Sequence, residues 1–84
     1  MYCRYLYTMI GMNYDKKNLE KLAENIRNQR KYLNLSQEKL AEKCDFDRTY
    51  ISLLERSKRN ITFLNLKKLS LGLEMSLSDV LKGI

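Results

Sequence analysis

The 84-residue chain contains no histidine, proline or tryptophan, and only three glycines and two cysteines. Without histidine it lacks the side chain that most often serves as a general base or a metal ligand. Two cysteines cannot complete a zinc site when no histidine assists them. The composition also fits neither a disulfide scaffold nor a collagen-like or disordered chain. These absences argue against an enzyme, a metal site, a cofactor and a small-molecule substrate, and they favour a small binding domain.

Cys3 and Cys44 are accompanied by no secretory signal, so the sequence gives no reason to expect a disulfide. Cys44 falls at an apolar position of a predicted helix, where a reduced thiol packs as a small hydrophobic side chain. Cys3 lies in the N-terminal segment, where a redox switch is the alternative. We therefore expect a protein of a reducing compartment, the cytoplasm.

Residues 1–13 differ in composition from the rest of the chain, because four of the six tyrosines lie within the first 14 residues. The apolar run there is too short for a membrane span, which needs about 20 apolar residues, and it lacks a signal-peptide cleavage site. Met9 and Met12 are candidate alternative starts. We expect a flexible extension over 1–13, one folded domain over 14–84 and no membrane association. A packed arm or an added edge strand is the alternative for the extension.

The body of the chain has apolar residues at the spacing of amphipathic helices, and no useful length alternates with the period of a strand. Residues typical of helix N-caps precede the apolar runs. The first predicted helix covers 17–33, and the second is about nine residues long and starts after its N-cap Ser36. The third covers 48–55 after Asp47, the fourth follows Thr62, and the fifth covers 77–82 after Ser76. The sequence predicts a compact all-α domain of five helices.

The inward faces of these helices supply the predicted core. It consists of Leu19, Leu22, Ala23, Ile26, Leu33, Leu40, Ala41, Cys44, Ile51, Leu54, Phe63, Leu66, Leu69 and Leu73. Gly72 lies within the fourth helix, at a cost of about 1 kcal/mol relative to alanine. A close contact with another helix or subunit would explain a glycine there.

Sixteen lysines and arginines against ten acids give the chain a charge of +6, and the placement of this charge is informative. Between Arg48 and Arg59, four basic residues accompany one acid, a local charge of +3. The helix that starts there carries Arg48, Thr49 and Ser52 on its outer face, while its inner face is apolar. Arginine pairs with guanine, and serine or threonine with several base edges. A short helix, a tight turn and such a second helix are typical of DNA-binding helix-turn-helix units.

Two segments, IRNQRKYLNLSQEKLAEKCDFDRTYISLLER (26–56) and RNITFLNLKKLSLGLEMSLSDVL (59–81), resemble the Cro/CI-type helix-turn-helix family, also called the Xre family. Within them, DRTYISLLERSKRN (47–60) and GLEMS are most similar to the controller proteins of restriction–modification systems, although phage repressors and antitoxins share the scaffold. The resemblance implies a lambda-repressor-like fold, with helices two and three as the DNA-binding unit.

The resemblance also assigns DNA contacts residue by residue. Base-reading positions are occupied by Arg48, Thr49, Ser52 and Arg59; positions at the DNA backbone by Gln37, Tyr50, Ser57 and Asn60, with Arg56 as a further candidate there. Gln37 is expected to brace the recognition helix as well, and an ion pair between Arg30 and Glu55 to position it. Tyr50 alternatively covers the edge of the core, and Arg59 alternatively remains a mobile loop charge.

Three positions depart from the family pattern. Asn34 and Glu74 stand where glycine is common, and Ile61 stands where proline is common. Asparagine tolerates the left-handed conformation. For Glu74, the sequence leaves open whether the residue adopts that conformation.

The C-terminus is dense in apolar residues. Some of them belong to the core, and the surplus suggests a dimer face, with a purely intramolecular role as the alternative. These apolar residues are Leu73, Met75, Leu77, Val80, Leu81 and Ile84. One recognition helix reads only a few base pairs, whereas a two-fold dimer reads two half-sites about 34 Å apart.

The expected function is that of a sequence-specific transcription regulator, which acts as a homodimer on palindromic operators in double-stranded DNA. We expect a bacterial or phage-encoded protein that works at the nucleoid, as the controller of a restriction–modification operon. A phage-type repressor is a near alternative. An antitoxin that sequesters a toxin through its apolar C-terminus or tyrosine-rich N-terminus is the alternative from another class.

Overall fold

The computed structural model of the chain describes residues 12–84, and its side chains from residue 16 onward. Its helices are α2 (Met12–Tyr32), α3 (Gln37–Cys44), α4 (Arg48–Glu55), α5 (Phe63–Gly72) and α6 (Leu77–Val80). No strand occurs within residues 12–84. The all-α, five-helix prediction is therefore confirmed. The expectations for Cys3 and for residues 1–11 lie outside the described residues.

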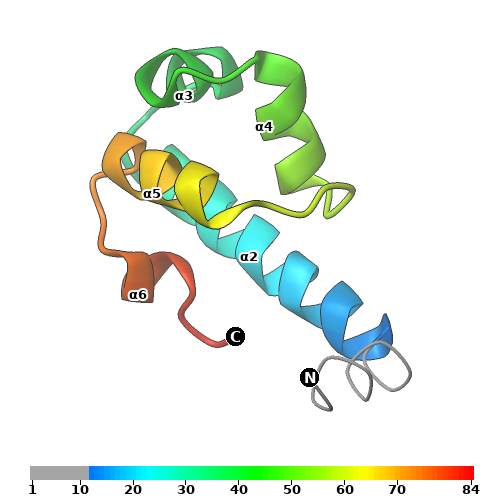
Figure 1. Ribbon diagram of the computed structural model, residues 1–84. Coiled ribbons are helices and arrows are strands. Elements are labelled where there is room, and N and C mark those ends of the chain that lie inside the picture. Colours follow the sequence, from blue (N-terminus) through cyan, green and yellow to red (C-terminus); the bar gives the residue numbers. More distant parts are fainter. Residues whose placement is uncertain (1–11) are drawn as a thin grey trace.

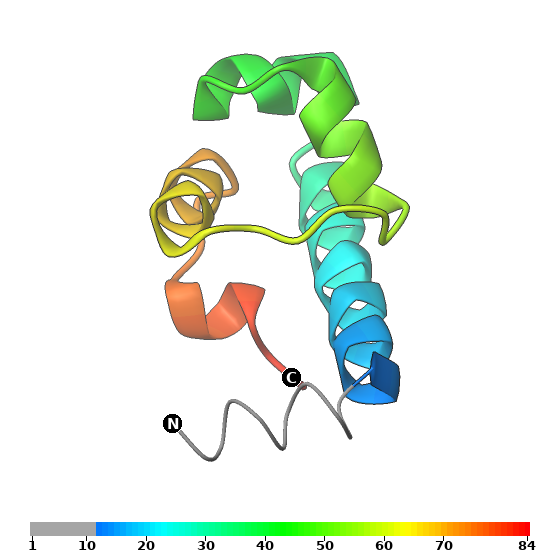
Figure 2. The same cartoon turned by 45° about the vertical axis from the view of Figure 1, so that its right-hand side comes forward.

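The long helix α2 forms one side of the molecule, and the shorter helices pack around it (Figures 1 and 2). Helix α3 crosses one end, α4 packs on both α2 and α3, and α5 and α6 cover the remaining side. The core lies between these elements. Its fully buried large side chains are Ile26, Leu40, Ile51, Leu54, Leu69, Leu73 and Val80.

Hydroxyl side chains fix the starts of three helices. Ser36, Thr62 and Ser76 each accept a hydrogen bond from the backbone N–H three residues further along, at 3.0, 3.3 and 3.1 Å. Each bond satisfies one of the amides that a helix start leaves without a partner. Asp47 occupies the N-cap position of α4, as predicted, but its side chain makes no cap hydrogen bond.

Left-handed residues close the tight turns that follow the helices. Asn34, Asp45, Ser57 and Glu74 have φ angles of 58°, 60°, 60° and 57°. The question that the sequence left open at Glu74 is thereby answered: this residue adopts the left-handed conformation that glycine takes most easily. Its carboxylate also lies 2.7 Å from the ammonium of Lys43 on α3.

Several expectations about helix faces and bounds were wrong. Leu19 and Leu33, expected in the core, are half-buried and lie outside its cluster, and the last helix ends at Val80 rather than at residue 82. Phe63, expected in the core, leaves 65% of its surface exposed. It occupies the first turn of α5, where side chains tilt toward the helix start and so project beyond the core; Ile61, just before the cap, packs there instead. Helix α2 begins at Met12 rather than at residue 17, because no glycine or proline interrupts the residues between them.

Gly72 is explained by a close contact between α5 and α3. A Cβ atom added at Gly72 would fall inside the contact distance of Cys44 Sγ. Cys44 is buried, as predicted, and this burial raises the pKa of its thiol to about 11, although the charge of Lys43 and a hydrogen bond with the Gly72 backbone act in the opposite direction. The thiol is therefore neutral at ordinary pH and packs as a hydrophobic group.

We predict that Gly72→Ala lowers the free energy of unfolding by about 1–3 kcal/mol, since overpacking against Cys44 outweighs the gain in helix propensity. Urea denaturation measures the effect. In a Cys44→Ala background the added methyl group has room, so the same substitution should be neutral or stabilising there. An equal loss in both backgrounds would contradict this contact as the reason for the glycine.

Candidate nucleic-acid interface

Helices α3 and α4, joined by the turn at Asp45, form the predicted helix-turn-helix unit. Helix α4 has two different faces: Arg48 and Thr49 are exposed and Ser52 is half-buried, whereas Ile51 and Leu54 are fully buried. The free amides and the positive dipole end of α4 lie at its exposed first turn, beside Arg48, where a phosphate group would be stabilised. The helix thus presents a polar, basic surface at its start.

The other end of α4 is held by a buried carboxylate. Glu55 is only 4% exposed. Arg30 donates two hydrogen bonds to it, from Nε to Oε2 at 2.6 Å and from Nη2 to Oε1 at 2.9 Å. Gln37 Nε2 donates to the same Oε1 at 3.2 Å. The expected ion pair and the expected bracing by Gln37 are therefore both present, whereas a phosphate contact by Gln37 stays a prediction.

Arginines of α2 extend this anchor to neighbouring backbone groups. Arg30 Nη1 donates to the carbonyl of Leu35 at 2.9 Å, which ties down the turn between α2 and α3. Arg27 Nη1 donates to the backbone carbonyl of Glu55, one of the carbonyls that the end of a helix leaves free. The long helix thus fixes both members of the helix-turn-helix unit.

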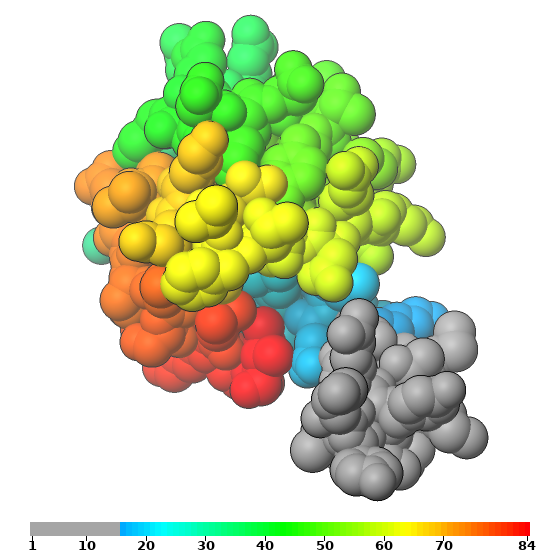
Figure 3. Space-filling model, in the orientation of Figure 1, coloured from blue at the N-terminus to red at the C-terminus, as the bar shows by residue number. Residues whose placement is uncertain are grey.

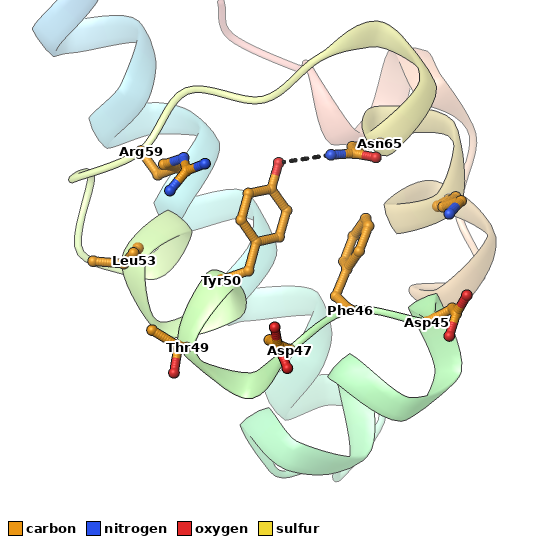
Figure 4. Close-up of a pocket in the computed structure, with 9 residues that line it drawn as sticks. Asp45, Phe46, Asp47, Thr49, Tyr50, Leu53, Arg59 and Asn65 are labelled. Carbon is orange, nitrogen blue, oxygen red and sulfur yellow. Dashed lines mark hydrogen bonds between the residues drawn. The ribbon is translucent and has the colours of Figure 1, made fainter.

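Tyr50 covers the edge of the core and faces an open groove (Figure 4). Its ring packs edge-on against Phe46, with the ring centroids 4.9 Å apart. Its hydroxyl accepts a hydrogen bond from Asn65 Nδ2 at 3.2 Å, and the guanidinium carbon of Arg59 lies 5.6 Å from the ring centroid. Tyr50 therefore covers the edge of the core, as the alternative expected. Its predicted contact with the DNA backbone stays a prediction.

The loop after α4 holds the remaining predicted DNA contacts. Arg56, Arg59 and Asn60 are exposed. Ser57 is half-buried, and its hydroxyl donates to the carbonyl of Leu19 at 3.4 Å. The side-chain oxygen of Asn60 accepts from the amide of Ile61 at 2.8 Å. Ser57 and Asn60 therefore shape the loop, whatever contact they make with DNA.

The predicted dimer face needs a correction at two residues. Leu73 and Val80 expose none of their surface in the single chain, so both belong to the core and have no area left to bury in a dimer. Met75 and Leu77 pack against that core and are half-buried. Leu81 and Ile84 are exposed.

Side-chain amides of α2 explain why these C-terminal residues turn inward. Gln29 Nε2 donates to the carbonyl of Leu73 at 2.9 Å. Asn25 Nδ2 donates to the carbonyls of Val80 and Lys82 at 2.8 and 2.9 Å. Sequence reasoning missed both amides, together with Arg27 and Asn65. The one available signal was that Asn25 and Gln29 lie one helical turn apart, beside the apolar stripe.

No helix within residues 12–84 is both long enough and apolar enough to cross a membrane. Over the same part of the chain, no group of three potential ligands gathers where a metal ion would bind.

We predict that Glu55→Gln lowers the free energy of unfolding by about 3–5 kcal/mol, because it leaves the charge of Arg30 without its partner in a buried site. Thermal and urea denaturation measure the loss. The matched variant Glu42→Gln breaks an exposed pair with Lys39, at 3.3 Å, and should cost less than about 1 kcal/mol. Equal stability of the two variants would show that the buried pair does not anchor α4.

Comparison with known proteins agrees with this geometry. The sequence model of the helix-turn-helix family, HTH_3, matches residues 26–80. Control protein C.MunI of a Mycoplasma species is 47% identical over 51 residues, which are 61% of this chain and 69% of that protein.

Two solved structures are also similar. The restriction–modification controller protein C.AhdI from Aeromonas hydrophila has a TM-score of 0.74 at 33% identity, covering 76% of this chain and 97% of that one. The C.Esp1396I tetramer in complex with its natural 35 base-pair operator has a TM-score of 0.66 at 38% identity, covering 76% of this chain and 95% of that one. Because the family model matches more than half of this chain, the chain belongs to the Xre-type helix-turn-helix family.

Proposed function

We propose that this chain is the controller protein of a restriction–modification operon, a transcription regulator that binds a palindromic operator as a homodimer. The observation that carries the proposal is the first turn of α4, which presents Arg48 and Thr49 to solvent while Glu55 fixes the far end of the same helix. The similar C.MunI and C.AhdI are control proteins, and C.Esp1396I is bound to its operator. Such a regulator works in the bacterial cytoplasm, where nucleoid DNA carries the operator.

In this proposal, α4 enters the major groove, where Arg48, Thr49 and Ser52 read base edges. Arginine makes a bidentate pair with guanine, and the hydroxyls of serine and threonine accept or donate at several bases. Arg59 reads a base from the following loop. The backbone contacts fix the register of the protein on the duplex without reading sequence. They come from Gln37, Tyr50, Arg56, Ser57 and Asn60.

The proposed dimer face is the apolar surface at the C-terminus. Leu81 and Ile84 line a groove together with Leu22, Ile61 and Leu66. Figure 3 shows the start of α5 and the C-terminal residues side by side on one face of the molecule, and Phe63 and Leu64 at this start are largely exposed. Exposed apolar residues at and near such a groove favour an interaction site, and in this proposal a two-fold partner covers it with the same patch of its own.

We predict that Arg48→Ala weakens operator binding by about 1–3 kcal/mol and relaxes the preference at one base position in each half-site. Selection of bound sequences from random DNA identifies the operator, and fluorescence anisotropy at fixed salt gives the affinities. Lys17→Ala removes the same charge from an exposed position near the start of α2. This end of α2 lies away from α3 and the start of α4 (Figure 1), so the variant should leave the preference unchanged. If Arg48→Ala binds operator and scrambled DNA as the unmodified protein does, the recognition role of α4 is wrong.

We predict that Ile84→Glu weakens the dimer at least about tenfold, since it places a charge within an apolar interface, and that operator affinity falls with it. Analytical ultracentrifugation measures the association, and circular dichroism checks that the helices remain. Tyr32→Glu is the control, because Tyr32 is 78% exposed and does not line the C-terminal groove. Unchanged association of the Ile84 variant would place the dimer face elsewhere.

A further inference from the structure

A cationic side chain lies against each of two aromatic rings at the start of the recognition helix, α4. Phe46 in the turn and Tyr50 on α4 pack edge-to-face, with an interplanar angle of 72°. The guanidinium of Arg59 lies over the Tyr50 ring, and the ammonium of Lys68 lies 5.9 Å from the centroid of the Phe46 ring. Figure 4 shows Tyr50 between Arg59 and Phe46. Cation–π attraction is the shared physical feature of both contacts.

Arg59 depends on this ring for its position. It is exposed, it lies in the loop between α4 and α5, and none of the ion pairs found in residues 16–84 includes it. A free arginine side chain samples many rotamers, and holding it in one costs conformational entropy. A ring beneath the planar guanidinium restrains it before DNA arrives.

The Tyr50 ring is in turn held in place by α5. Asn65 Nδ2 donates to the tyrosine hydroxyl. The backbone N–H of Asn65 donates to the cap oxygen Oγ1 of Thr62, so this residue belongs to the capped first turn of α5. Because the hydroxyl is the acceptor in this bond, its own proton is free for another partner. The tyrosine can therefore support Arg59 with its ring and donate a hydrogen bond to a phosphate from its edge.

We propose that Tyr50 and Asn65 are positioning residues for Arg59. Asn65 fixes the ring of Tyr50, and this ring holds the guanidinium of Arg59 beside the recognition helix. In this way Asn65, a half-buried residue of α5, affects the preference for one base of the operator. The proposal rests on the proposed function, because it assumes that Arg59 reads a base of the operator.

The decisive experiment is a double-mutant cycle between Asn65→Leu and Arg59→Ala, with affinities for the selected operator and for its single-base variants. Asn65→Leu keeps a side chain of similar size and removes the donor. We expect it to lower operator affinity about three- to tenfold, and to relax the same base position that Arg59→Ala relaxes, while the position read by Arg48 stays sharp. In the Arg59→Ala background, Asn65→Leu should no longer alter base preference. Any remaining loss of affinity, through the phosphate contact of Tyr50, should be smaller and the same for all sequences.

Lys68→Gln is the matched control, because it removes the other cation of the aromatic pair and leaves Tyr50 and Asn65 intact. It should weaken binding to all sequences alike and leave base preference unchanged. Equal effects of Asn65→Leu with and without Arg59, or a base preference that Asn65→Leu does not alter, would overturn the proposal.

A measurement on the free protein separates this proposal from the proposed function. The ring of Tyr50 should shift the NMR signals of the Arg59 side chain upfield, and Tyr50→Leu should abolish the shift, with circular dichroism as the check on folding. Absence of the shift in the unmodified protein would show that the Tyr50 ring does not hold Arg59, and would overturn the proposal. Presence of the shift in a protein that selects no DNA sequence overturns the proposed function and leaves the contact intact.

Discussion

The arrangement of the DNA-facing helices depends on one buried carboxylate. Glu55 ends α4 inside the protein, where an ionised group without a partner would be strongly destabilising. The bidentate bond from Arg30 supplies that partner from α2, and Gln37 adds one from the start of α3. Because a charged pair of this kind has strict geometry, the three helices hold a fixed orientation. Arg48 and Thr49 at the start of α4 are thereby presented to solvent.

Because of this anchoring, the outer face of α4 can carry polar and basic residues that take little part in the fold. The side chain of Asp47 makes no cap bond, and Arg48 and Thr49 are exposed, whereas Ile51, Leu54 and Glu55 are buried on the opposite face. A helix of eight residues is not stable alone in water. Tertiary contacts at its inner face and far end therefore replace the local interactions that the exposed first turn lacks.

Sequence patterns predicted the parts of this design that depend on short-range spacing. The apolar period located the helices, and the cap residues located the starts of four of them. The family resemblance implied the pair of Arg30 and Glu55. Contacts between residues far apart in the sequence could not be predicted from such spacing. Phe63 fits an apolar stripe as well as Leu66 does, and only the end of the packed region decides that it is exposed. Likewise, apolar character alone cannot show which C-terminal residues belong to the core and which to a dimer face. The division depends on the side-chain amides of Asn25 and Gln29, which bind backbone carbonyls of the C-terminal segment.

The charge of +6 gains meaning from which cations are held and which are free. Arg27 and Arg30 are partly buried and bonded to acceptors inside the protein, so they contribute to the fold and present little charge to a partner. Arg48 and Arg56 are exposed at the two ends of α4, where phosphate and base contacts are possible. Arg59 belongs to neither group: it is exposed, yet an aromatic ring restrains it. A side chain that is held without being neutralised loses less conformational entropy on binding. If the proposed function holds, this restraint makes the loop of Arg59 a source of sequence preference as well as of affinity.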